Sequence, residues 1–93
     1  MLAFTSDNGR RLQRLALTIP MSLLLEGEDS KIEHPAYTVD LSRNGVRVRT
    51  TLVLYPGELL EIGDSVQSIP SRVVWVERSS VHGSLAGLEF LEN

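Results

Sequence analysis

Apolar residues occupy every second position from Leu15 to Leu25, and this alternation constrains the fold more than any other feature of the sequence. A period of two is typical of a β-strand that buries one face. Pro20 lies on the opposite parity. Because proline cannot donate a hydrogen bond to a neighbouring strand, we expect this strand to be an edge or to be bulged at Pro20.

Further segments with strand-like composition follow at roughly even spacing. They span residues 37–41, 46–49, 58–62, 69–77 and 85–91. Residues 26–35, which include Gly27 and Pro35, are predicted to form a loop or a wide hairpin, and glycine, proline or asparagine marks the other connections. Six strands without a helical stretch predict an all-β fold, either a small antiparallel barrel or a sandwich. A closed barrel would also remove exposed strand edges.

The size and composition of the chain fit one small globular domain. It has 93 residues, of which 42% are hydrophobic and 23% are charged. No cysteine is present, which excludes disulfides and cysteine-based zinc sites. The most apolar stretch, residues 15–25, is shorter than the roughly 20 residues of a membrane span. We therefore expect a soluble, cytoplasmic protein without membrane insertion.

Basic residues are concentrated at Arg10, Arg11 and Arg14, although the net charge of −3 argues against a surface built for DNA or RNA. Arg10 and Arg14 point the same way in a helix or in an extended chain, because a separation of four residues places both side chains on one face in either case. Guanidinium groups suit a phosphate or the O6/N7 edge of guanine. The alternative is that these are solvated surface arginines.

A second polar motif, Asp40-x-Ser42-x-x-Gly45, follows a short strand. Asp40 could accept hydrogen bonds from the N1–H and N2–H₂ donors of guanine, or it could orient an arginine. Ser42 offers a hydroxyl at the turn, and Gly45 would permit a positive φ and a close approach of another group. The alternative is a simple turn in which Asp40 and Ser42 cap their own backbone.

The arginine motif precedes the alternating apolar segment at 15–25, and the Asp40 motif follows it. In this order, the two motifs resemble those of the PilZ domain family, Arg-x-x-x-Arg and Asp/Asn-x-Ser-x-x-Gly. The resemblance extends through residues 72–75 and 87–90, so it covers nearly the whole chain. It implies a six-stranded antiparallel β-barrel of the split-barrel type at residues 15–91, preceded by a flexible N-terminal arm at 1–14. Many members have a helix after the last strand, whereas we expect little or no C-terminal helix here.

The resemblance also implies a receptor for cyclic di-GMP, a bacterial second messenger. Arg10 and Arg14 would contact guanine edges and phosphates, and Asp40, Ser42 and Gly45 would form the barrel side of the site. Ordering a five-residue arm costs about 5–10 kcal/mol, whereas two charge-assisted arginine contacts return about 3–6 kcal/mol. Binding would therefore also need the second motif, base stacking, or an arm that is already partly ordered.

Three other residues are possible secondary ligand contacts, namely Arg11, Arg47 and Trp75. Arg47 lies on the strand that leaves the second motif, where an arginine is more often part of a solvated strand face. Trp75 could stack on a base. The alternative is that Trp75 belongs to the core, which is the more common place for a lone tryptophan among valines.

No pattern in the sequence predicts an enzyme. His34 and His82 are far apart, and no nucleophile–base grouping, metal-ligand spacing or phosphate-binding glycine loop is present. We therefore expect no cofactor and no metal. The expected partners are cyclic di-GMP and a downstream protein. Two other hypotheses are a PilZ-like adaptor that binds only proteins and a barrel that binds single-stranded nucleic acid, which the acidic net charge disfavours.

Overall fold

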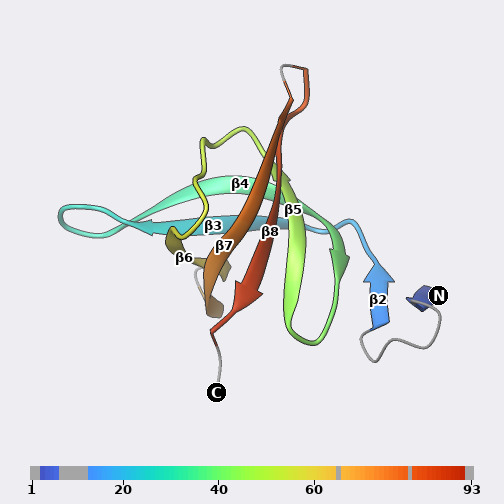
Figure 1. Ribbon diagram of the computed structural model, residues 1–93. Coiled ribbons are helices and arrows are strands. Elements are labelled where there is room, and N and C mark those ends of the chain that lie inside the picture. The colour runs from blue at the N-terminus through green and yellow to red at the C-terminus, as the bar shows by residue number, and fades with distance from the viewer. Residues whose placement is uncertain (1–2, 7–12, 65, 80, 92–93) are drawn as a thin grey trace.

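The computed structural model describes residues 3–6, 13–64, 66–79 and 81–91, which form eight β-strands and no helix (Figure 1). The strands are β1 (Ala3–Ser6), β2 (Gln13–Ala16), β3 (Pro20–Glu26), β4 (Lys31–Leu41), β5 (Gly45–Thr50), β6 (Leu59–Gly63), β7 (Ser68–Ser79) and β8 (Gly83–Phe90). The prediction of an all-β fold is confirmed. In the described part of the chain there is no helix of the length and apolarity that a membrane span requires.

Six of these strands close into an antiparallel barrel. Neighbours follow the order β4-β3-β6-β7-β8-β5, and pairing between β4 and β5 completes the ring. The predicted six-stranded barrel is therefore confirmed. The two short strands β1 and β2 form a hairpin outside the ring, and β2 adds to the end of β4 through Leu15 opposite Leu41 and Ala16 opposite Asp40.

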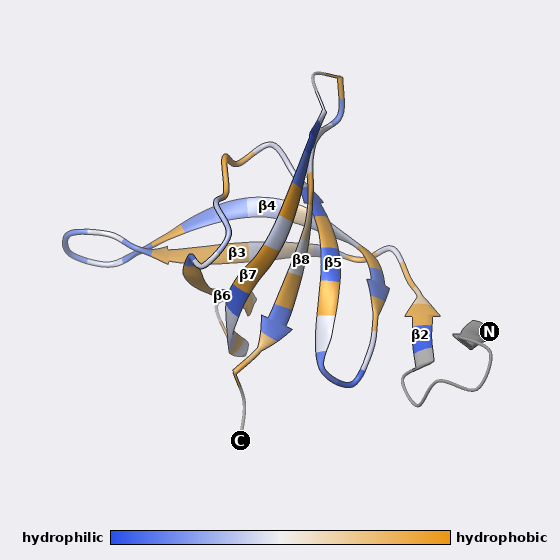
Figure 2. Ribbon diagram, viewed as in Figure 1, coloured by the Kyte–Doolittle hydropathy of each residue, from blue (hydrophilic) through white to orange (hydrophobic). Residues whose placement is uncertain are grey.

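The barrel interior is filled by aliphatic side chains. Fully or nearly fully buried residues come from every barrel strand and from the loop after β5: Leu23, Ala36, Val46, Val48, Leu54, Leu60, Ile62, Val73, Ala86 and Leu88. Burial of such side chains is the main favourable contribution to folding. Figure 2 shows the matching alternation of hydrophobic and hydrophilic residues along β5.

The predicted strand at 15–25 is interrupted, and its description as an edge or bulged strand is wrong. β2 ends at Ala16 and β3 begins at Pro20, so the proline occupies the first position of a strand that lies between β4 and β6. Pairing with β6 begins only at Ser22. The missing N–H of Pro20 therefore breaks no ladder, and proline is tolerated at a strand start for this reason.

The connection between β2 and β3 is held by Thr38 of β4. The buried hydroxyl of Thr38 donates to the Leu17 carbonyl and accepts from the Ile19 N–H, the latter at 2.8 Å. Backbone bonds from Leu17 N–H to Val39 and from Thr38 N–H to Ile19 add to this. The N-terminal segment is thus attached to β4 immediately beside the Asp40 motif.

Of the two alternatives predicted for residues 26–35, a loop or a wide hairpin, the structure shows the hairpin. β3 continues to Glu26 and β4 begins at Lys31, so most of the segment forms a long hairpin that projects from the barrel (Figure 1). The sequence also gave no indication of β1. The charged residues of this hairpin are tolerated because the projecting strands are exposed.

Candidate functional site

A β-bulge in β4 places Asp40 on the outside of the barrel. Thr38 pairs with the core residue Val48, but the register then shifts and Asp40 pairs with Arg47. Without the extra residue Val39, Asp40 would share the inward face with Thr38, because side chains alternate along a strand. The bulge therefore points the carboxylate away from the core and toward two arginines.

Asp40 is the common partner of Arg14 and Arg47. Arg14 Nη2 donates to Asp40 Oδ1 at 2.7 Å. Arg47 Nε donates to both carboxylate oxygens at 2.9 Å, and its Nη2 also donates to Oδ2. These contacts cover the carboxylate, and Asp40 is only 6% exposed.

The ion pairs lower the pKa of Asp40 to about 2. The main cause is the hydrogen bonds from Arg47, with those from Arg14 adding to them, while burial acts in the opposite direction. The same bonds raise the pKa of Arg47. Asp40 is therefore ionised at neutral pH and holds two positively charged groups side by side.

Arg14 reaches this position because β2 is paired with β4. Its neighbours Leu15 and Ala16 lie opposite Leu41 and Asp40 in the register, so Arg14 comes just before the point where the two strands join. This second arginine of the Arg-x-x-x-Arg motif is thus brought to the Asp40 motif. Arg10 and Arg11 lie outside the described residues.

A second bulge, in β7, places Trp75 on the outer surface. Val73 pairs with the core residue Leu88, the register shifts at Val74, and Trp75 pairs with Gly87. The alternative that Trp75 belongs to the core is wrong, since it is 37% exposed. Its indole lies directly over Gly87, where an added Cβ would come within 2.3 Å of Trp75 Nε1.

The two bulges bring the site residues into one row across the outer face. Asp40 of β4 lies opposite Arg47 of β5, Arg47 lies opposite Gly87 of β8, and Gly87 lies opposite Trp75 of β7. Cations therefore stand at one end of the row and an aromatic ring at the other. Because Gly87 has no side chain, nothing stands between Arg47 and the indole at that position.

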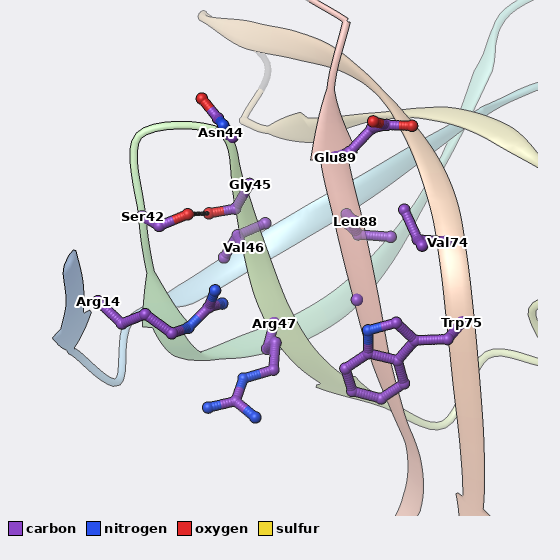
Figure 3. A pocket seen from close by; sticks show the side chains of 11 residues that line it. Arg14, Ser42, Asn44, Gly45, Val46, Arg47, Val74, Trp75, Leu88 and Glu89 are labelled. Atoms are coloured by element: carbon purple, nitrogen blue, oxygen red, sulfur yellow. Dashed lines mark hydrogen bonds between the residues drawn. The ribbon is translucent and has the colours of Figure 1, made fainter. Parts of the chain in front are cut away.

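A pocket of about 480 Å³ lies over this row (Figure 3). It is lined by Arg14, Ser42, Asn44, Gly45, Val46, Arg47, Val74, Trp75, Gly87, Leu88 and Glu89. Its volume falls within the range of about 300–1,000 Å³ usual for small-molecule sites. In Figure 3 the two arginines lie on one side, and Val74, Trp75 and Glu89 lie on the other.

The turn at Ser42–Gly45 forms one end of the pocket. Ser42 N–H donates to the Gly45 carbonyl at 2.8 Å, and its hydroxyl reaches the same oxygen at 3.3 Å. The expected positive φ at Gly45 is wrong, since positive φ occurs instead at Gly57, Gly63 and Gly83. The expected close approach is found, because a Cβ on Gly45 would lie 2.2 Å from the Leu88 carbonyl oxygen.

Most of the residues singled out in the sequence thus meet at one place. Arg14, Ser42, Gly45, Arg47 and Trp75 line the pocket, and Asp40 holds its two arginines rather than capping its own backbone. The sequence reasoning missed several other residues of the lining: Asn44, Val46, Val74, Gly87, Leu88 and Glu89. A glycine inside a strand, such as Gly87, was the one available signal, because it often marks a close approach of another group.

Comparison with known proteins agrees with this geometry. The family model of the PilZ domain matches residues 8–93, which include both motifs and all strands from β2 to β8. No curated protein matches the chain. The chain belongs to the PilZ domain family, whose members are ligand-binding and adaptor modules, generally for cyclic di-GMP.

Proposed function

We propose that this PilZ domain is a receptor for cyclic di-GMP, which it binds in the pocket between Arg14 and Trp75, and that the bound state is sensed by a partner protein. The observation that carries the proposal is the single carboxylate of Asp40 holding Arg14 and Arg47 at the edge of a pocket whose far side is Trp75. A cyclic dinucleotide has phosphates for the cations and purines for the aromatic ring.

Arg14 and Arg47 are suited to the phosphates. Guanidinium groups bind phosphate oxygens with paired, charge-assisted hydrogen bonds. The Arg14 and Arg47 side chains are 28% and 39% exposed, so both remain accessible from the pocket while bonded to Asp40. Because Asp40 holds the two arginine side chains in place before the ligand arrives, less entropy is lost when the ligand binds.

Trp75 is suited to a guanine base. Its indole is spread over Gly87 on the pocket wall and is partly exposed. Stacking of a base on an aromatic ring contributes roughly 1–3 kcal/mol. The two arginine contacts alone do not supply enough binding free energy to order the arm. Stacking on Trp75 supplies part of the remainder.

The pairing of β2 with β4 reduces the cost of ordering the arm. Arg14 is already in place at the edge of the barrel, so its contact with the ligand does not carry the ordering cost of about 1–2 kcal/mol per residue. In this proposal Arg10 and Arg11 also contact the ligand. The ligand-bound state then presents a changed surface to the partner protein, which shifts the equilibrium between two states of the domain.

The proposal is tested by titration of the intact chain with cyclic di-GMP, followed by the fluorescence of Trp75, which is the one tryptophan in the sequence. We expect a saturable change in emission. Arg14→Ala should weaken binding by about tenfold or more, because a charge-assisted contact is lost. Arg43→Ala is the matched control. Arg43 is exposed and lies in the turn at Ser42–Gly45 beside the pocket, but it is not part of the pocket lining. Equal affinity in all three proteins would contradict the assigned site.

A further inference from the structure

Two carboxylates belong to the site, and they have different surroundings. Asp40 Oδ1 accepts from Arg14 and Arg47, and Oδ2 accepts twice from Arg47. A carboxylate offers about four acceptor positions, so the two arginines occupy the acceptor capacity of Asp40. Asp40 therefore has little acceptor capacity left for guanine, although the sequence suggested that role for it. Another acceptor in the pocket is better suited to bind the base.

Glu89 is the other carboxylate, and it lines the pocket itself. It lies on β8 two residues after Gly87, so both residues present the same face of the strand. Its cross-strand neighbours are Gly45 of β5 and Arg72 of β7. Because Gly45 has no side chain, Glu89 borders the pocket without an obstacle on that side.

The Glu89 carboxylate remains accessible. Its side chain is 47% exposed, and its one ion pair among the described residues is from Arg72 Nε to Oε1 at 3.2 Å. Arg72 is equally exposed, and such surface pairs are easily rearranged. In Figure 3, Glu89 lies across the pocket from Arg14 and Arg47, further along β8 than the Trp75 indole.

This position excludes Glu89 from phosphate binding and favours contact with a base. A carboxylate repels phosphates, which the arginines attract to the other side. A base stacked on Trp75 would lie beside β8, which carries Gly87 against the indole and Glu89 two residues further along. Guanine presents two adjacent donors, N1–H and N2–H₂, to a carboxylate, whereas adenine presents one donor beside an acceptor.

We propose that Glu89 accepts hydrogen bonds from the donor edge of guanine and thereby selects guanine over adenine in the bound dinucleotide. This inference rests on the proposed binding of cyclic di-GMP. It assigns the two carboxylates separate tasks: Asp40 orients the cations, and Glu89 recognises the base.

The test compares three ligands by calorimetry: cyclic di-GMP, cyclic di-AMP and cyclic di-IMP, whose hypoxanthine bases lack only the N2 amino group. The wild-type chain should prefer cyclic di-GMP over each of the others by about tenfold or more, the discrimination usual for a paired base contact. Glu89→Gln, which places an amide N–H₂ beside the guanine donors, should weaken cyclic di-GMP and bring the three affinities close together. Because the Glu89 side chain is exposed and glutamine has nearly the same shape, the Tm of this variant should be near that of the wild type. A thermal melt checks this in parallel.

Arg72→Ala is the matched control. It removes the partner of Glu89 but keeps the carboxylate, so the preference for cyclic di-GMP should persist. If Arg72→Ala reduces the preference as much as Glu89→Gln, or if Glu89→Gln keeps the wild-type preference, the inference is wrong while the receptor proposal stands. If the wild-type chain binds none of the three ligands, both proposals are wrong.

Discussion

Two groups of opposite charges join different strands of the domain, and they differ in burial. Around Asp40, two arginines cover a carboxylate that is almost inaccessible to solvent. Around Glu61 of β6, Lys31 and the Ser68 hydroxyl contact a carboxylate that is partly exposed. In both groups the pKa of the carboxyl group is lowered, to about 2 for Asp40 by Arg47 and Arg14, and for Glu61 by Lys31 and Ser68.

Burial, rather than the number of charges, decides how much an ion pair contributes to stability. An exposed pair is screened by water and salt and contributes little. A buried carboxylate that loses its charge leaves its partners without compensation, which is costly. We therefore expect the Asp40 group to determine both stability and ligand binding, and the Lys31–Glu61 pair to affect neither strongly.

The largest effect is expected for Asp40→Asn. The substitution keeps the shape but removes the charge that holds Arg14 and Arg47, and breaking a buried charge pair at a binding site costs 2–5 kcal/mol, so affinity for cyclic di-GMP should fall by about 30-fold or more. The free energy of unfolding should fall by about 2 kcal/mol, less than for fully buried pairs because both arginines are partly exposed. Calorimetry and urea denaturation measure the two losses.

Glu33→Gln is the control for this prediction. Glu33 is an exposed acid on the same strand, β4, so its loss changes the net charge equally without touching the site. Similar losses in the two variants would show that net charge, and not the buried group, is responsible.

A pH titration sharpens the same comparison. The pKa of Asp40 in the folded chain is about 2, below its ordinary value of 3.8, so its stabilisation is complete above the ordinary value and is lost as the pH falls toward 2. The difference in free energy of unfolding between the wild type and Asp40→Asn should therefore shrink by about 2 kcal/mol between pH 6 and pH 2. A difference that does not depend on pH would contradict the lowered pKa.

An intermediate effect is expected for Gly87→Ala at the aromatic end of the row. The added Cβ would meet Trp75 Nε1 at 2.3 Å, so the indole must move from the pocket wall. We expect a changed emission spectrum and affinity for cyclic di-GMP reduced by about tenfold, within the range of one lost stacking contact. Trp75→Ala should give a similar loss and Trp75→Phe a smaller one. Unchanged affinity in Gly87→Ala and Trp75→Ala together would exclude stacking on Trp75.

The smallest effect is expected for Lys31→Met in the exposed group. It removes the partner of Glu61 but leaves the pocket intact. Affinity for cyclic di-GMP should stay within about twofold of the wild type, and the Tm should change only slightly, as for other surface pairs. A loss comparable to that of Asp40→Asn, measured by the same titration and thermal melt, would show that burial does not separate the two groups.

The sequence predicted the barrel and most of the motif residues because both depend on local patterns. Alternation of apolar residues identifies strands, and the spacing of Arg14, Asp40, Ser42 and Gly45 identifies the family. The structure brings these residues together, while Arg10 and Arg11 lie outside its described part.

The direction of Asp40 and Trp75 could not be predicted in the same way. Both have the parity of core residues, and each is turned outward by a bulge next to it, at Val39 and Val74. A bulge is a property of strand pairing, which involves residues far away in the sequence. The position of Glu89 could not be predicted for the same reason. It borders the pocket only because β5 and β7 lie on either side of β8.

The most direct test of the central claim is a calorimetric titration of the intact wild-type chain with cyclic di-GMP, repeated with Asp40→Asn. The wild type should give a saturable heat of binding, and the variant should give little or none over the same concentrations. Absence of heat in the wild type, or undiminished binding in Asp40→Asn, would contradict the claim that Asp40 holds two arginines in place for this ligand.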